Sequence, residues 1–304
     1  MTKEEEEITD YKVLEEASID DDIYDRQKRI PGWDQRKVSN ASVMVIGAGA
    51  TGNELVKNLV LTGIGKIILI DYDIIERSNL NRCVLFNMEK DIENKYKVDV
   101  VKEACKNLNP EVEIVALKQK LEEIDEELYK QSTVVCSCVD NIEARIHANN
   151  YAYYHNKPFI DSGIDEFFGS IQVVYPGVED SACLQCGITG TDIKLMWKKF
   201  SCTGQEIKTE DGETMGKMAT IITTTAIIGG IQSQQALKFI LGVDYFNEHG
   251  KWNINIGAPL VGKQLNYNGL TNRFDIIEKL MNPKCDLCSY IKRNKNKKIE
   301  LKKL

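Results

Sequence analysis

The chain has 304 residues, including nine cysteines and three histidines, and a formal net charge of −7. This length allows one large or two modest domains without disulfide support. An apolar share of 42% and a charged share of 28% exclude collagen, coiled-coil and wholly disordered proteins. No segment approaches the ~18 apolar residues of a membrane span, and the acidic start lacks a signal-peptide core. We therefore expect a cytoplasmic protein with free or metal-bound cysteines and no membrane contact.

Charge separates the two ends of the chain from its middle. Residues 1–22 carry ten acids against two bases, and residues 292–304 carry seven bases against one acid. Both segments are typical of solvated tails, one acidic and one basic. The basic tail lacks interleaved aromatic residues and the middle of the chain is acidic, so nucleic-acid binding is not expected.

The patterned region begins with a strand, a turn and a helix. Residues 41–46 form an apolar run that enters a glycine-rich turn, residues 53–61 have helical apolar spacing, and residues 66–70 form a second buried strand. Further helices are expected at 98–108, 122–131 and 220–241, and further strands at 112–117, 133–138, 158–160 and 169–176. This alternation predicts an α/β fold with a Rossmann-like, doubly wound, mostly parallel sheet. Without an internal repeat, the second half is expected to pack onto the same sheet.

The glycine-rich turn has the spacing of a nucleotide-binding motif. Gly47 permits the tight turn, Gly49 lets the backbone approach a phosphate, and Gly52 allows close helix packing. Asp71 follows the second strand, where a carboxylate can hydrogen-bond a ribose hydroxyl. The motif alone leaves NAD, FAD, S-adenosylmethionine and ATP open.

Three charged residues at predicted strand ends favour a triphosphate. Arg82 and Lys97 supply positive charge of the kind needed near β- and γ-phosphates, and a nicotinamide site does not need both. Asp140 follows the next apolar strand, where a carboxylate suits Mg²⁺ bound to a triphosphate. Taken together in this order, they predict ATP with Mg²⁺.

Two CxxC pairs predict a metal site. Cys183 and Cys186 form the first pair, and Cys285 and Cys288 the second. Two such pairs give the four thiolates of a tetrahedral structural Zn²⁺ site. Because the pairs lie about a hundred residues apart, the metal would tie the C-terminal segment back onto the domain. A redox role for either pair is the alternative.

The other five cysteines divide into two groups. Cys83, Cys105, Cys136 and Cys138 lie in apolar or helical patterns that predict buried thiols. Cys202 instead follows two lysines and precedes a polar loop, a setting that favours a thiolate within reach of a bulky partner. These local features leave open whether Cys202 is a nucleophile or a bystander.

The sequence resembles the ubiquitin-activating-enzyme superfamily, which includes ThiF, MoeB and HesA-type adenylyltransferases for sulfur carriers. The motifs that carry the resemblance are, in chain order, Tyr24-Asp-Arg26-Gln27, the turn from Gly47 to Glu54, Asp71, Ser78-Asn79-Leu80-Asn81-Arg82, Lys97, Asp140-Asn141, the paired CxxC elements and the helix from Ile228 to Lys238. The resemblance implies that Lys97 is the phosphate lysine, with Lys95 as the alternative, and that Arg26 reaches the ATP of a neighbouring subunit in a homodimer. It implies that Asn79 belongs to the ATP site and that Cys202, in a catalytic-cysteine loop, forms a thioester.

The resemblance also implies the reaction and the partner. A ubiquitin-like or sulfur-carrier protein ending in Gly-Gly would be adenylated at its C-terminal glycine and then transferred to Cys202, with a conjugating enzyme as a possible later partner. The corresponding division is an adenylation domain at 23–291, with a nucleotide-binding half at 41–165 and a crossover and zinc half at 166–291.

Alternative functions stay open at this stage. A relative that adenylates a different acid, such as a tRNA threonylcarbamoyladenosine dehydratase, shares the motifs, although the acidic middle disfavours it. An NAD-dependent oxidoreductase needs only the glycine turn and Asp71. A catalytically silent partner subunit is disfavoured because the set of ATP-site residues is complete.

Overall fold

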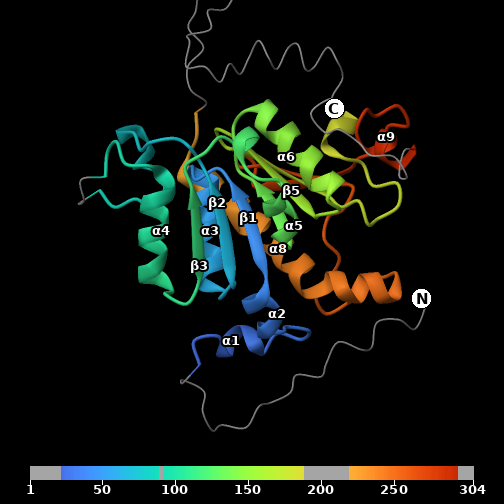
Figure 1. The fold of residues 1–304 in the computed structure, drawn as a ribbon, viewed down its shortest axis with the longest axis horizontal. Helices are drawn as coiled ribbons and strands as arrows, with labels where there is room; N and C mark the ends of the chain where they lie inside the picture. The colour runs from blue at the N-terminus through green and yellow to red at the C-terminus, as the bar shows by residue number, and fades with distance from the viewer. Residues whose placement is uncertain (1–21, 89–91, 188–218, 294–304) are drawn as a thin grey trace, which may run out of the picture.

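An eight-stranded sheet forms the centre of the fold in the computed structural model, which describes residues 22–88, 92–187 and 219–293 (Figure 1). The strand order is β3-β2-β1-β4-β5-β6-β7-β8. The strands are β1 (Ser42–Ile46), β2 (Lys66–Ile70), β3 (Glu113–Leu117), β4 (Val134–Ser137), β5 (Phe159–Asp165), β6 (Phe168–Val174), β7 (Lys263–Asn268) and β8 (Arg273–Glu278). Strands β1 to β5 pair in parallel, and β6 to β8 continue the sheet in antiparallel pairs.

Helices cover both faces of the sheet, as the doubly wound prediction required. On one face, α3 (Ala50–Leu61), α4 (Lys97–Leu108) and α8 (Ile222–His249) enclose a core that includes Val43 and Val45 of β1. On the other face, α5 (Glu127–Gln131) and α6 (Ile142–Tyr154) pack over Met44 and Ile46 of the same strand. Alternate residues of a strand point to opposite faces, so one apolar run supplies both cores.

Helices α3 and α8 approach each other closely next to the glycine-rich turn. A Cβ placed on Gly229 of α8 would lie 2.5 Å from the Cβ of Glu54. The Asn58 amide also donates a hydrogen bond to the Ser233 hydroxyl at 3.0 Å. The long helix from the second half of the chain therefore packs directly on the helix that starts at the glycine-rich turn.

Short elements complete the described residues. They are α1 (Asp25–Lys28), α2 (Gln35–Asn40), the 3₁₀ turns η1 (Arg77–Asn79), η2 (Leu121–Glu123) and η3 (Leu184–Gly187), and α9 (Cys288–Arg293). No helix within the described ranges is long and apolar enough to cross a membrane. Of the two charged tails, only Asp22, Lys292 and Arg293 fall within the described residues.

Two sequence-based expectations about elements need correction, and one pair of strands was not expected. In place of the helix expected at 122–131, the structure has η2 and α5, which are separated by the extended backbone of Ile124, with a φ of −76° and a ψ of 151°. Helix α8 extends beyond Leu241 to His249 and ends at Gly250, whose φ is +69°. The β7–β8 hairpin was not expected. Apolar and polar residues alternate in β7, at Leu265 and Tyr267, but every residue of β8 is exposed, so no buried apolar run marks that strand.

Residues 41–165 and 166–291 contribute to the same sheet. Strands β1 to β5 come from the first of these segments, and β6, β7 and β8 come from the second. The expectation that the second half packs onto the first sheet is confirmed.

Candidate active site and metal centre

The glycine-rich turn joins β1 to α3 and has the close packing that its motif predicts. Gly47 has a φ of +98°, and a Cβ placed on it would lie 2.7 Å from the Cys138 carbonyl oxygen. A Cβ on Gly52 would lie 2.0 Å from the Gly47 carbonyl oxygen. A Cβ on Gly49 meets no atom of the described residues within 4 Å. The turn is therefore tightly fixed at its two ends and open at Gly49, beside the N-terminus of α3.

Asp71 follows β2 and binds the glycine-rich turn directly. One carboxylate oxygen accepts a hydrogen bond from the Ala48 N–H at 2.7 Å, and the other accepts one from the Asp73 N–H at 2.8 Å. Burial raises the pKa of Asp71, while the nearby Lys97 charge opposes that shift. The carboxylate is thus held at the edge of the turn, where the sequence predicted a ribose-binding acid.

Lys97 is the first residue of α4 and is tied twice to Asp73. Its ammonium lies 2.7 Å from an Asp73 carboxylate oxygen, and its N–H donates to the Asp73 carbonyl at 3.0 Å. Burial lowers the pKa of Lys97, but the Asp71 and Asp73 carboxylates outweigh it, so the pKa is raised. The neighbouring Lys95 is exposed. Lys97, and not Lys95, therefore carries its charge toward Asp71.

The segment around η1 holds Asn79 and Arg82. The Asn79 side-chain oxygen accepts a hydrogen bond from the Glu76 N–H at 3.0 Å, and Asn79 is buried. The Arg82 guanidinium donates to the Ser78 carbonyl and to the Asn81 side-chain oxygen. Asn79 therefore shapes the 3₁₀ turn from which the Arg82 side chain extends.

Asn53 connects this segment to the glycine-rich turn. Its amide donates to the Ala48 carbonyl at 2.8 Å, and its carbonyl oxygen accepts from the Leu85 N–H at 2.9 Å. Burial raises the pKa of Cys83 to about 11, while the charges of Arg82 and Lys97 lower it. Cys83 therefore lies buried directly after Arg82, on the segment that Asn53 attaches to the glycine-rich turn.

Asp140 lies beside the same turn. It is exposed and follows Val139, whose Cγ1 would lie 3.2 Å from a Cβ on Gly47. Asn141 caps α6 by accepting a hydrogen bond from the Ala144 N–H at 2.7 Å. The carboxyl ends of β1, β2 and β4 thus bring the glycine-rich turn, Asp71 and Asp140 to one edge of the sheet, as expected for parallel strands.

Arg26 lies apart from this edge. It is exposed on α1, and α1 is anchored by Gln27, whose amide donates to the Thr62 carbonyl at 2.8 Å. Thr62 caps the far end of α3, a helix about 18 Å long at 1.5 Å per residue. Arg26 is therefore separated from the turn of its own chain by about that length, which leaves a role in a neighbouring subunit as a prediction.

Cys202, the predicted thioester-forming residue, lies outside the described residues. The predicted buried thiols Cys83, Cys105 and Cys136 are buried, and Cys138 is half-buried. The Cys138 thiol contacts the Gln232 side-chain oxygen at 3.2 Å.

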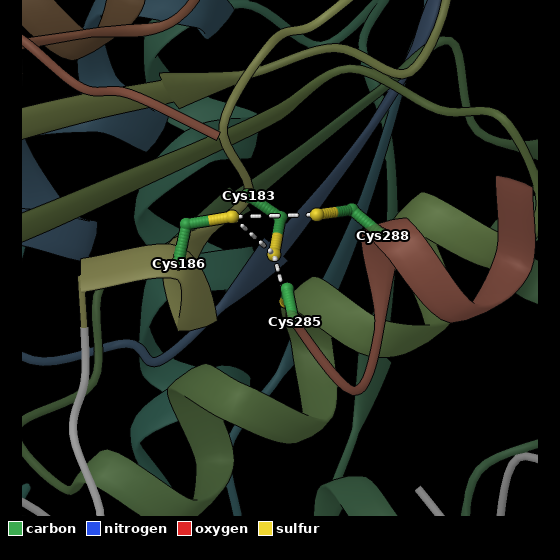
Figure 2. Close-up of side chains that lie close together, drawn as sticks. All are labelled: Cys183, Cys186, Cys285 and Cys288. Carbon is green, nitrogen blue, oxygen red and sulfur yellow. Dashed lines mark hydrogen bonds between the residues drawn. The ribbon is translucent and has the colours of Figure 1, made fainter. Parts of the chain in front are cut away.

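The two CxxC pairs converge into one cluster (Figure 2). The sulfurs lie within 4.8 Å of one another, with separations of 3.6 Å for Cys183 and Cys285 and 3.3 Å for Cys186 and Cys288. Four sulfurs bound tetrahedrally to zinc at about 2.3 Å lie ~3.8 Å apart. The donor set therefore fits zinc.

Sequence reasoning missed the polar residues that hold these sites in place. Asn149 of α6 is buried, and its side-chain oxygen accepts a hydrogen bond from the Leu184 N–H, between the first two cysteines, at 3.1 Å. Asp73 fixes Lys97, and Asn53 fixes the segment after Arg82. No local signal in the sequence indicated this role, because α6 was not predicted and the burial of Asn149 is visible only in the structure.

Comparison with known proteins defines the class to which this fold and site belong. A model of the ThiF family matches residues 24–287. The chain belongs to the ThiF family.

The relatives include enzymes that activate ubiquitin-like modifiers. The chain is 28% identical over 283 residues to ubiquitin-like modifier-activating enzyme 5 of Bombyx mori, covering 87% of this chain and 63% of the relative. It is 38% identical over 152 residues to SUMO-activating enzyme subunit 2 of Dictyostelium discoideum, covering 49% of this chain and 22% of the relative. The chain thus spans less than two thirds of the length of either relative.

Solved structures show the same fold. The crystal structure of E. coli MccB with ATP has a TM-score of 0.68 and 23% identity, and the match covers 90% of this chain and 75% of that one. At this level of identity, the similarity establishes the Rossmann-like architecture.

Proposed function

We propose that this protein uses ATP to adenylate the C-terminal glycine of a ubiquitin-like or sulfur-carrier protein ending in Gly-Gly. The observation that carries the proposal is the convergence of the open turn at Gly49 with Asp71, Lys97 and Asp140 at one edge of a ThiF-family sheet. An oxidoreductase using NAD needs no lysine charge beside the ribose-binding acid, so this convergence favours ATP.

The residues at this edge have distinct roles in the proposed reaction. The backbone around Gly47, Gly49 and Gly52 binds the phosphates, with Asn79 shaping the adjacent turn, and Asp71 binds the ribose. A carboxylate oxygen of the carrier attacks the α-phosphorus, and the bond to the pyrophosphate oxygen breaks. Lys97 and Arg82 stabilise the negative charge that develops on the pyrophosphate.

Asp140 is the residue that would hold Mg²⁺. Its exposed carboxylate beside the glycine-rich turn suits an oxygen-preferring cation bound together with phosphates. The cation would neutralise phosphate charge, and the reaction needs no general base because the carrier carboxylate is already ionised at neutral pH.

The four clustered cysteines are proposed to bind one structural zinc. They join η3 to the start of α9 and fasten the C-terminal segment to the sheet. A closed four-thiolate site has no open coordination position, so zinc supports the fold and takes no part in the chemistry.

A second step on Cys202 is proposed from the family resemblance. Its thiolate attacks the carbonyl carbon of the acyl-adenylate, the bond to the phosphate oxygen breaks, and AMP leaves. With a Cys202→Ala variant, the carrier thioester should be lost on non-reducing gels. An intact thioester in that variant would remove Cys202 from the mechanism.

Arg26 is proposed to complete the site of the partner subunit in a homodimer. Mixing an inactive Arg26→Ala chain with an inactive Lys97→Met chain should then restore partial activity, because one site of each mixed dimer has both native residues. No recovery would argue that Arg26 does not act in trans. A cytoplasmic location and a downstream conjugating enzyme belong to the same proposal.

The proposal is tested by isotopic pyrophosphate exchange into ATP. Exchange should require a carrier with an intact Gly-Gly end and should be lost when the final glycine is deleted. If no carrier of this kind supports exchange while tRNA binds at physiological salt, the adenylation of a tRNA-linked acid becomes the better description.

A further inference from the structure

Asp161 is a buried carboxylate in the middle of the sheet, next to the proposed ATP site. It is 4% exposed, lies in β5, and pairs in register with Ser137, the last residue of β4. Its charged partner is Arg145 of α6, with 3.3 Å between Nη1 and Oδ2. Burial raises the pKa of Asp161, and Arg145 opposes that shift. Because desolvation of two charges offsets most of their attraction, stability alone does not explain this pair.

The Nε of Arg145 holds the loop that carries Asp140. Its Nε donates to the Val139 carbonyl at 3.0 Å, one residue before Asp140. The guanidinium lies over Gly163 of β5, where a Cβ would be 3.2 Å from Nη1 and 3.4 Å from Nη2. A planar fork can bind a carbonyl and a carboxylate at once, which a lysine ammonium cannot do with the same geometry. The loop is thereby attached to β5.

The same loop is held from the opposite face of the sheet. Gln232 of α8 is buried and donates to the Ser137 carbonyl at 2.9 Å and the Ile160 carbonyl at 3.0 Å. The Cys138 N–H donates to the Ile46 carbonyl at 2.8 Å. The backbone leading to Asp140 is therefore fixed from both sides, although the Asp140 side chain itself is exposed.

From this arrangement we propose that Arg145 and Asp161 are positioning residues that fix the backbone at Val139 and so place Asp140 for magnesium-bound nucleotide. The inference rests on the proposed function for the identity of the ligand. Residues that orient a metal ligand typically change metal affinity 10–100-fold when altered. The pair would therefore govern how much Mg²⁺ the nucleotide site requires.

Three substitutions test this role in the full-length chain. Asp161→Asn keeps the shape but removes the charge, and Arg145→Lys keeps the charge but removes the fork. Gly163→Ala leaves Arg145 and Asp161 unchanged but crowds the fork, and its Cβ would also lie 3.0 Å from the Ser170 hydroxyl. In the ligand-free protein, each should speed hydrogen exchange of the amides at 139–144. Glu113→Gln, which alters the exposed pair between Lys66 and Glu113, is the matched control and should leave these amides unchanged.

The second readout is calorimetric ATP binding as a function of Mg²⁺ concentration. We expect the three variants to need about tenfold more Mg²⁺ for half-maximal binding, with ATP binding in EDTA unchanged. Wild-type Mg²⁺ dependence in both Arg145→Lys and Gly163→Ala would overturn the positioning role, even if Asp161→Asn fails to fold. Equal losses with and without Mg²⁺ would also overturn it.

The same measurements separate this inference from the proposed function. Wild-type protein that binds magnesium-ATP but exchanges no pyrophosphate with any carrier would contradict the proposed adenylation. A shift in the Mg²⁺ requirement of the variants would still support the positioning role of Arg145 and Asp161. If exchange is carrier-dependent and the variants behave as wild type, positioning fails alone.

Discussion

The two sites of this protein are held together in different ways. One site, called here the nucleotide edge, is the sheet edge formed by the glycine-rich turn, Asp71, Lys97 and Asp140. There, protein groups already bind one another, as in the hydrogen bond from the Ala48 N–H to Asp71 and the ion pair between Lys97 and Asp73. In the cysteine cluster, the four sulfurs lie within 4.8 Å of one another, and three of the pairs are 3.3 to 3.8 Å apart. Thiols are weak hydrogen-bond donors, so their mutual contacts cannot replace a metal.

This difference indicates which of the two sites depends on a ligand for its structure. The nucleotide edge consists of short connections next to parallel strands and is shaped before ATP arrives. The cysteine cluster joins segments about a hundred residues apart, so closing it brings η3 and α9 together. We therefore expect metal loss to have the larger effect on stability, and loss of the charged side chains beside the glycine-rich turn to affect mainly the chemistry.

The largest effect is expected from Cys285→Ser. Loss of a metal site is among the most severe single-residue changes, so the free energy of unfolding should fall by about 3–5 kcal/mol and zinc content should drop. Elemental analysis and thermal denaturation measure both. Cys105→Ala, at a buried thiol outside the cluster, is the control and should keep its zinc. Full zinc content in Cys285→Ser would contradict the proposal that the four cysteines bind one structural zinc.

Lys97→Met should reduce carrier-dependent pyrophosphate exchange about 10²–10³-fold, the usual consequence of losing one charge-stabilising donor. Thermal denaturation should change little. Lys95→Met is the matched control, since Lys95 is exposed two residues away, and it should keep nearly full exchange. Equal losses of pyrophosphate exchange in Lys97→Met and Lys95→Met would mean that the Lys97 charge has no specific role in the reaction.

Gly47→Ala should destabilise the chain by about 1–3 kcal/mol, because alanine is strained at a φ of +98°. Its Cβ would also lie 2.7 Å from the Cys138 carbonyl oxygen. Chemical denaturation with and without ATP measures the loss of both stability and binding. Gly230→Ala, in the middle of α8 with open space around it, should have the opposite sign and stabilise by about 0.5–1 kcal/mol.

The smallest effect concerns pH. Burial lowers the pKa of His147, with Glu122 opposing the shift. As the pH falls below the unfolded value of about 6.5, the unfolded chain takes up the proton first, so the folded state loses stability. The denaturation midpoint should therefore fall less between pH 7 and pH 5 in His147→Gln than in wild type. His249 is exposed, so His249→Gln should show the same fall in midpoint as wild type. A smaller fall in His249→Gln as well would contradict burial as the cause.

Residues with a local signal were predictable from the sequence. Gly47, Asp71 and Lys97 each lie at a strand end or a helix start, and a CxxC pair is recognisable within four residues. The parallel sheet was predictable from the alternation of strands and helices, because a helix that connects two strands places them parallel in the same sheet.

The supporting residues could not be predicted because their partners are distant in the sequence. Asp161 meets Arg145 only when β5 lies beside β4, and Asn149 meets the first CxxC pair only when η3 folds onto α6. The β7–β8 hairpin depends on pairing with β6 and leaves its last strand exposed. Tertiary pairing, and not local pattern, determines these features.

The most direct test of this account is carrier-dependent pyrophosphate exchange measured side by side in wild-type, Cys202→Ala and Lys97→Met chains. If the nucleotide edge alone performs adenylation, Cys202→Ala should exchange at the wild-type rate with a Gly-Gly carrier, while Lys97→Met should be nearly inactive. Exchange that is lost in Cys202→Ala, or that proceeds without a carrier, would contradict the account.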